Sequence, residues 1–150
     1  MIFTTNSPTE TENVGRLLAE KLDTAGVLRA FIALCGEMGV GKTAFTRGFA
    51  SHFGITSVKS PTYTIVNEYR GKSSIFHFDM YRIESSDDLY SIGFDDYVER
   101  EGFCISEWSE NIEEFLPEDI IKVTISRSAE CVDKRNIEII LDKEYENISI

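Results

Sequence analysis

The stretch Gly36–Thr43, with the sequence GEMGVGKT, decides the fold because it joins a strand-like segment to a helix-like one. At every position it matches G-x-x-x-x-G-K-[ST], the pattern of a glycine-rich loop that holds phosphate groups. Residues 30–35 before it form a continuous apolar run, typical of a parallel strand covered on both faces. Residues 42–53 after it place Phe45 and Phe49 on one helical face. The order of strand, loop and helix predicts a site for the phosphates of a nucleotide.

The residue types in the loop have physical reasons. Backbone N–H groups must wrap around phosphate oxygens, and glycine permits the positive φ angles and close approach that this needs. The helix that follows directs its N-terminal dipole at the same anion. Lys42 would place an ammonium against the β and γ phosphates, and the Thr43 hydroxyl can bind Mg²⁺. The alternative is an ordinary glycine-rich turn between a strand and a helix.

Two carboxylates are candidates for holding that Mg²⁺. Asp79 lies on the more polar face of the strand pattern IFHFDMYR, residues 75–82, and Glu107 ends the apolar run 103–106. Ligands bind at the carboxyl ends of strands in open α/β sheets, where both acids would lie. Each alone is also compatible with a solvated acid at a strand end, but their joint occurrence with the loop favours a metal role.

The segment Ser60–Thr64, with the sequence SPTYT, is a weaker motif. A hydroxyl such as that of Thr62 could reach the γ-phosphate and Mg²⁺, as in the switch segment of a nucleotide hydrolase. Hydroxyl residues around a proline are also common in ordinary turns. His77 is interpreted as a structural hydrogen-bonding residue in preference to a base.

Composition bounds the class of protein. The chain has 150 residues, 42% of them hydrophobic, which predicts one globular α/β domain over residues 1–150. Three widely separated cysteines indicate neither a disulfide scaffold nor a zinc site and suit a reducing cytoplasm. No apolar run has the length of a membrane span and the first residues do not form a signal peptide, so we expect a cytoplasmic protein without membrane attachment.

Charge is divided unevenly along the chain. The net charge is −11, which argues against a free-standing binder of nucleic acid or of anionic membranes. Residues 42–82 nevertheless have a balance of +4, whereas residues 83–119 hold thirteen acids against Arg100 alone. The acidic region either faces a basic partner or is simply a solvated helix face.

Hydrophobic patterns and turn residues predict the remaining elements. They are a strand over residues 1–5, a helix from Ser7 to Gly26, a hairpin of residues 62–69 and 74–82, a helix over 86–100, a strand over 103–107, a helical turn over 111–116, and closing strands over 120–126 and 136–141.

The chain resembles the bacterial TsaE (YjeE) family. The resemblance rests on four blocks in the family's order: GEMGVGKTAFTRGF (36–49), SPTYTIVNEY (60–69), HFDMYR (77–82) and ISEW (105–108). It implies a P-loop NTPase-like three-layer α/β sandwich, with a mostly parallel sheet and an antiparallel hairpin portion. Ser109 departs from the proline that family members often have after Glu-Trp, so the local turn is expected to differ but not the chemistry.

The resemblance also implies site residues. Lys42, Asp79 and Glu107 would be catalytic, and Thr43, Asp79 and Glu107 would hold Mg²⁺, although Asp79 could instead orient the attacking water. Trp108 would pack near the nucleotide or a partner, and Thr11 and Arg135 would make contacts away from the phosphates. The candidates for contact with ATP or ADP are Thr11, Gly36, Met38, Gly39, Val40, Gly41, Lys42, Thr43, Thr62, Trp108 and Arg135.

In function, the family resemblance implies a Mg²⁺-dependent ATPase of the machinery that makes threonylcarbamoyladenosine in tRNA. It would act on TsaB and TsaD subunits, meet tRNA only indirectly, be a monomer when alone and hydrolyse ATP slowly without partners. Two alternatives stay open: a small P-loop kinase, and a docking module gated by nucleotide without catalysis. No Arg-rich lid supports the kinase, and no N-K-x-D segment supports a GTPase.

Overall fold

The computed structural model describes residues 1–61 and 65–150. Its elements are β1 (Ile2–Thr5), α1 (Pro8–Thr24), β2 (Arg29–Cys35), α2 (Lys42–His52), β3 (Val66–Arg70), β4 (Ser74–Asp79), α3 (Ser86–Ser91), α4 (Phe94–Glu99), β5 (Gly102–Glu107), η1 (Ser109–Phe115), β6 (Ile121–Arg127), β7 (Arg135–Leu141) and η2 (Lys143–Tyr145), with η marking 3₁₀ helices. Within these described ranges, no helix is long and apolar enough to cross a membrane.

All the described strands form one sheet in the order β1-β7-β6-β2-β5-β4-β3. The pairs β6–β2, β2–β5 and β5–β4 at the centre are parallel. The pairs at both edges are antiparallel, and β3–β4 is the hairpin that the sequence predicts. The parallel centre brings the carboxyl ends of β2, β4 and β5 to one edge of the sheet.

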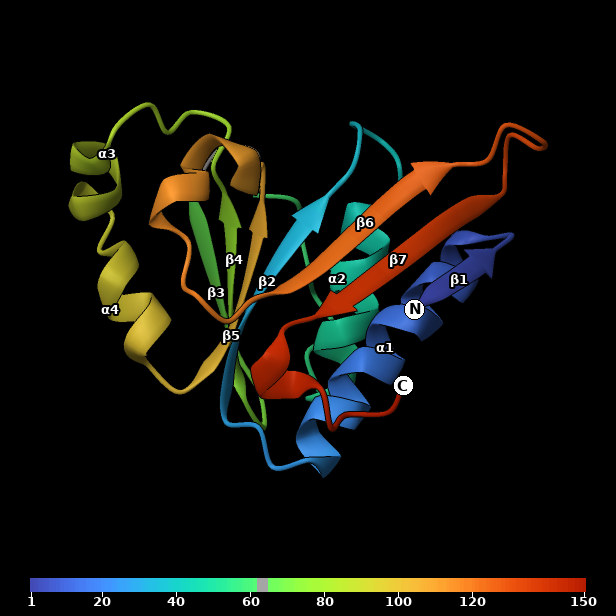
Figure 1. Cartoon of the computed structure of the whole chain (residues 1–150), viewed down its shortest axis with the longest axis horizontal. Coiled ribbons are helices and arrows are strands. Elements are labelled where there is room, and N and C mark those ends of the chain that lie inside the picture. Colours follow the sequence, from blue (N-terminus) through green and yellow to red (C-terminus); the bar gives the residue numbers. More distant parts are fainter. Residues whose placement is uncertain (62–64) are drawn as a thin grey trace.

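Helices cover both faces of the sheet, so the chain has three layers (Figure 1). Side chains alternate along β2: Ile32 and Leu34 pack under α1 and α2, whereas Phe31 and Ala33 pack under α3, α4 and η1. The α/β sandwich with a P-loop NTPase-like fold is therefore confirmed, with its parallel pairing confined to the central strands.

Local sequence signals explain where α1 begins and ends. The Ser7 side chain accepts a hydrogen bond from the Glu10 backbone N–H, and Pro8 fills the first helical position. Leu18 and Leu22 are fully buried on its inner face. The chain turns away at Gly26, which has a φ of 74°.

The predicted helix over residues 86–100 is instead two short helices, α3 and α4. The break lies at Gly93, between the end of α3 and the start of α4. Its φ of 73° is not helical. Phe94 and Leu89 both still reach the core because the break turns the second helix back onto the sheet. The predicted strand 74–82 ends early, at Asp79, where the Asp79 carboxylate accepts the Tyr81 N–H at 2.9 Å and closes a turn.

Candidate phosphate-binding site

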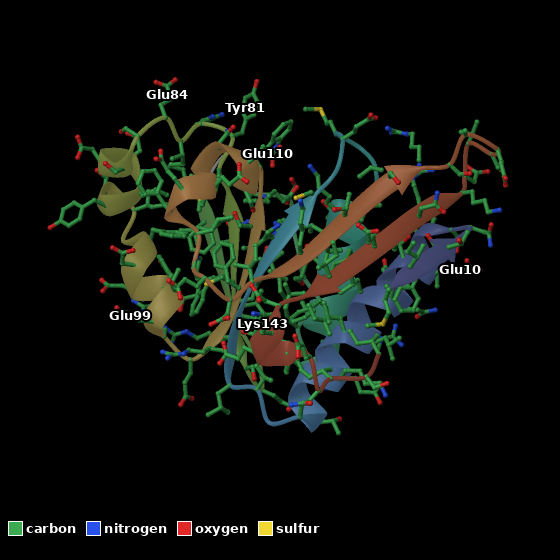
Figure 2. All side chains as sticks on the ribbon, viewed as in Figure 1. Glu10, Tyr81, Glu84, Glu99, Glu110 and Lys143 are labelled. Carbon is green, nitrogen blue, oxygen red and sulfur yellow. The ribbon has the colours of Figure 1, made fainter. Side chains whose placement is uncertain are left out.

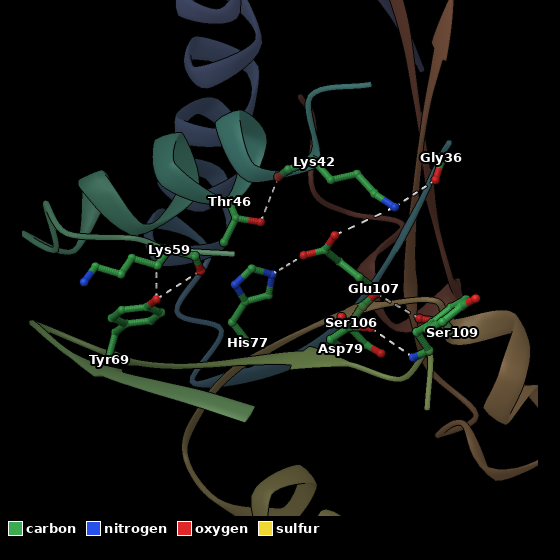
Figure 3. A network of polar contacts seen from close by, with 11 residues as sticks. Gly36, Lys42, Thr46, Lys59, Tyr69, His77, Asp79, Ser106, Glu107 and Ser109 are labelled. Atoms are coloured by element: carbon green, nitrogen blue, oxygen red, sulfur yellow. Dashed lines mark hydrogen bonds and ion pairs between the residues drawn. The ribbon is translucent and has the colours of Figure 1, made fainter. Parts of the chain in front are cut away.

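The glycine-rich loop and the two predicted carboxylates meet at the edge formed by the carboxyl ends of the parallel strands. The loop leaves β2 after Cys35, and Asp79 at the end of β4 is paired in register with Glu107 at the end of β5. The two-residue period of a strand places His77, Asp79 and Glu107 on the face covered by α2 (Figure 3). Glu107 ends its strand as the sequence predicts, whereas Asp79 ends β4 although the predicted strand continues to residue 82.

The loop has the backbone that phosphate binding requires. Gly36, Gly39 and Gly41 have φ angles of 155°, 74° and 119°, which side chains rarely allow. Gly41 directly precedes α2, and no side chain in the described part of the chain caps that helix. The helix N-terminus is therefore free to receive an anion.

A pocket of about 370 Å³ lies over this loop. Both carboxylates and Lys42 face it, which places cationic, hydroxyl and carboxylate groups around one space. Its lining residues are Met38, Gly39, Gly41, Lys42, Thr43, Ser60, Asp79, Glu107 and Trp108.

Lys42 is buried, with 6% of its side chain exposed, and has three contacts. Its Nζ donates to the Gly36 carbonyl oxygen at 2.8 Å and lies 3.7 Å from Oε1 of Glu107. It also lies 5.0 Å from the centre of the Trp108 ring. The ammonium is thereby held at the pocket wall among groups that a phosphate oxygen can replace.

Glu107 has two different partners for its two carboxylate oxygens. Oε1 faces Lys42, whereas Oε2 is 2.6 Å from Nε2 of His77 (Figure 3). Because an ionised carboxylate only accepts, the His77 Nε2–H is the donor. His77 is fully buried, in agreement with its interpretation as a structural hydrogen-bonding residue.

Trp108 covers the cation and forms one side of the pocket mouth. It is the only described non-glycine residue with a positive φ, at 60°. Its ring packs against Tyr81, with centroids 5.1 Å apart. The Asn111 side chain donates to the carbonyls of Met80 and Tyr81, so the turns after β4 and β5 are held together.

Four of the described residues that were predicted to contact nucleotide are outside the pocket lining: Thr11, Gly36, Val40 and Arg135. Arg135 donates from Nε to the Val40 carbonyl at 3.0 Å. Thr11 is buried, hydrogen-bonded to Thr5, with its methyl group 3.8 Å from the position of a Cβ on Gly41. In the structure these two residues contact or lie against the loop backbone.

The structure adds Arg127, which the sequence motifs do not single out. Its guanidinium pairs with Glu37 at 3.0 Å and donates to the Gly39 carbonyl. Arg127 on β6 is paired in register with Arg135 on β7. Both arginines donate hydrogen bonds to carbonyl oxygens of the loop. The signal is an arginine at the end of a strand, which becomes informative only when β6 is known to lie beside β2.

Thr62 is outside the described residues, while Ser60 from the same segment lines the pocket.

The residues that line the pocket fit a nucleoside triphosphate with Mg²⁺. The loop backbone, the helix N-terminus and Lys42 suit phosphate oxygens, and the pocket lining also contains Thr43, Asp79 and Glu107. Mg²⁺ in such sites is bound through one or two carboxylates together with substrate phosphates, so a complete protein cage is not needed.

The fold and this loop define a P-loop NTPase-like α/β protein. A family model described as threonylcarbamoyl adenosine biosynthesis protein TsaE matches residues 5–137. The chain belongs to the TsaE family, as its sequence blocks predict.

Individual relatives agree with this family. The tRNA threonylcarbamoyladenosine biosynthesis protein TsaE of Bacillus subtilis is 40% identical, over 89% of this chain and 80% of the relative. That of Haemophilus influenzae is 42% identical, over 84% of this chain and 80% of the relative. The crystal structure of Bacillus subtilis YdiB superposes with a TM-score of 0.79 at 32% identity, covering 99% of this chain and 90% of that one.

Proposed function

We propose that the chain is the Mg²⁺-dependent ATP-binding and ATP-hydrolysing subunit of the complex that makes threonylcarbamoyladenosine in tRNA. Family membership supports the pathway, because the relatives are named for threonylcarbamoyladenosine biosynthesis. The observation that carries the enzymatic part is the pocket in which Lys42, Thr43 and two strand-end carboxylates meet over the glycine-rich loop.

Each group has a defined task in this proposal. The loop amides and Lys42 bind the phosphates and stabilise the negative charge that grows on their oxygens. Thr43 and Glu107 would hold the metal, and Asp79 would hold its water shell or orient the attacking water. Bound Mg²⁺ would supply further neutralisation of phosphate charge. Trp108 lines one side of the pocket, with Tyr81 packed against its ring, and would limit the access of solvent.

The partner part of the proposal is that hydrolysis resets TsaB and TsaD between catalytic rounds. The layer of α3, α4 and η1 carries the exposed acids Asp87, Asp95, Asp96, Glu113 and Glu114. Figure 2 shows Glu84 and Glu99 projecting on the same side of the molecule. Such a surface repels nucleic acid and suits a basic protein surface, so tRNA would be met only through the partners.

The experiment mixes the chain with TsaB and TsaD and measures association and phosphate release together, with ATP and Mg²⁺. We expect association that depends on nucleotide and phosphate release that is slow alone and faster in the complex. Brisk hydrolysis without partners would contradict the regulatory role. Phosphate transferred to a small molecule, with none released, would favour a kinase. Many rounds supported equally by a non-hydrolysable analogue would favour a docking module without catalysis.

A further inference from the structure

His77 is a fully buried polar side chain beside the site. An apolar residue could fill the same space, so packing alone does not explain why a histidine stands there. Its Nε2 is 2.6 Å from Oε2 of Glu107. Its other ring nitrogen, Nδ1, is buried without a hydrogen-bond partner among the described residues. The ring therefore places one strong contact inside the protein, and that contact is made to the candidate metal-binding carboxylate.

We propose that His77 is a positioning residue, which fixes the Glu107 carboxylate so that one oxygen stays available to the pocket. This inference rests on the proposed function, because it concerns how Glu107 meets Mg²⁺. The imidazole contacts Oε2, and Oε1 is left 3.7 Å from Nζ of Lys42 at the pocket wall.

The physical need for such a residue follows from the position of Lys42. Only 9% of the Glu107 side chain is exposed, so its carboxylate has few water molecules to bind. Without a second partner, both oxygens would turn to the nearest cation, Lys42, and form a closer ion pair. That pair would occupy the carboxylate oxygen that Mg²⁺ needs. Because His77 binds Oε2, only Oε1 of Glu107 faces Lys42, and the ion pair between Glu107 and Lys42 stays weaker.

The test measures how strongly Mg²⁺ enhances nucleotide binding. Trp108 is the only tryptophan and follows Glu107 directly, so its fluorescence reports on the site. ADP is titrated with Mg²⁺ and again with EDTA. For His77→Leu we expect the enhancement by Mg²⁺ to fall about tenfold, the scale of one charged hydrogen bond. Binding in EDTA should stay within about twofold of wild type.

Two conservative variants separate positioning from space filling. Glutamine can place an amide N–H where Nε2 stands, whereas asparagine is too short to reach Oε2. We therefore expect His77→Gln to keep most of the Mg²⁺ enhancement and His77→Asn to lose it. This comparison stands even where His77→Leu fails to fold.

His52 supplies a matched control, because it forms the other histidine–carboxylate pair, with Asp23 at 2.8 Å. It lies at the end of α2 opposite to the loop. His52→Leu should lower the melting temperature slightly and leave the Mg²⁺ enhancement unchanged.

The outcomes distinguish the two proposals. Nucleotide binding by the wild type that ignores Mg²⁺ would overturn the proposed function. Mg²⁺-dependent binding in the wild type, with the same enhancement in His77→Asn as in His77→Gln and wild type, would overturn the positioning role alone.

Discussion

At the scale of single residues, the proposed function gives Lys42 the main part in how the loop holds an anion. Its ammonium is shared between a neutral carbonyl, a carboxylate and an aromatic face. A phosphate offers a stronger partner than the Gly36 carbonyl, so binding exchanges contacts within reach of the same side chain. We therefore expect Lys42 to contribute to phosphate affinity without a rearrangement of the fold.

Replacement of Lys42 by alanine should weaken ATP binding by about 10- to 100-fold, because a charged hydrogen bond contributes about 1.5–3 kcal/mol. Titration calorimetry measures the change. Lys72→Ala is the control, since Lys72 lies in the turn between β3 and β4, at the opposite end of β4 from the pocket. Equal affinities for the two variants would contradict this role for Lys42.

Asp79→Asn should reduce partner-stimulated phosphate release by about 100-fold or more while leaving the fold intact. The asparagine oxygen can still accept the Tyr81 N–H that closes the turn, so the melting temperature should stay near that of wild type. Phosphate release and thermal unfolding are measured on the same preparation. A loss of activity that matches a loss of folded protein would assign Asp79 a structural role only.

At the scale of elements, α1 supports α2 and through it the loop. The two helices pack so closely at Gly48 that a Cβ there would lie 1.8 Å from the Glu12 carbonyl oxygen. Arg47 and Glu12 add an ion pair at 2.7 Å beside this contact. The approach of the helices fixes where α2 begins and hence where its N-terminal amides point.

Gly48→Ala should therefore force the helices apart and lower the free energy of unfolding by about 1–3 kcal/mol or more. It should also weaken ATP binding, although Gly48 lies outside the pocket lining of the described residues. Arg47→Ala removes only the partly exposed ion pair and should cost at most about 1 kcal/mol. Denaturant unfolding compares them, and a Gly48→Ala variant as stable as Arg47→Ala would refute the argument.

Elements with strong local signals could be predicted from the sequence, and those that depend on the third dimension could not. The loop, α1, the hairpin and the two carboxylates follow from glycine spacing, a helix cap and strand ends. The break at Gly93 was missed because an apolar helical pattern continues through it. The contact of Arg127 with the loop and the contact between His77 and Glu107 both depend on which strands are neighbours. Local sequence patterns do not predict strand order.

At the scale of the whole molecule, charge is separated between two regions. The pocket combines Lys42 and the loop backbone with the carboxylates of Asp79 and Glu107, while the α3, α4 and η1 layer carries exposed acids. A chain with a net charge of −11 can thus hold an anion locally and still repel nucleic acid overall.

Changing four acids of α3 and α4 to lysine should weaken association with TsaB and TsaD; they are the exposed Asp87, Asp95 and Asp96 and the half-exposed Asp88. The effect should shrink as salt is added, since exposed charges are screened. Binding is measured at low and high salt. Unchanged association at both would show that this layer is a solvated face.

Stability should fall as the pH rises above about 9. Burial raises the pKa of the Cys104 thiol from an ordinary value of 9.0 to about 12. Between these values the unfolded chain releases a proton that the folded chain keeps, so the unfolded state gains stability with pH. Cys104→Ala should flatten this decline in denaturant unfolding at pH 8–11, while alanine at the exposed Cys131 should not. An equal slope in both variants would contradict the assignment.

Calorimetric titration with ATP and with adenosine, both with Mg²⁺, tests the central claim most directly. The claim is that the amides of the loop and Lys42 bind the nucleotide by its phosphates. We expect saturable binding of ATP at one site, much weaker binding of adenosine, and a smaller difference between the two in Lys42→Ala. Equal binding of ATP and adenosine by the wild type would show that this loop does not hold phosphate.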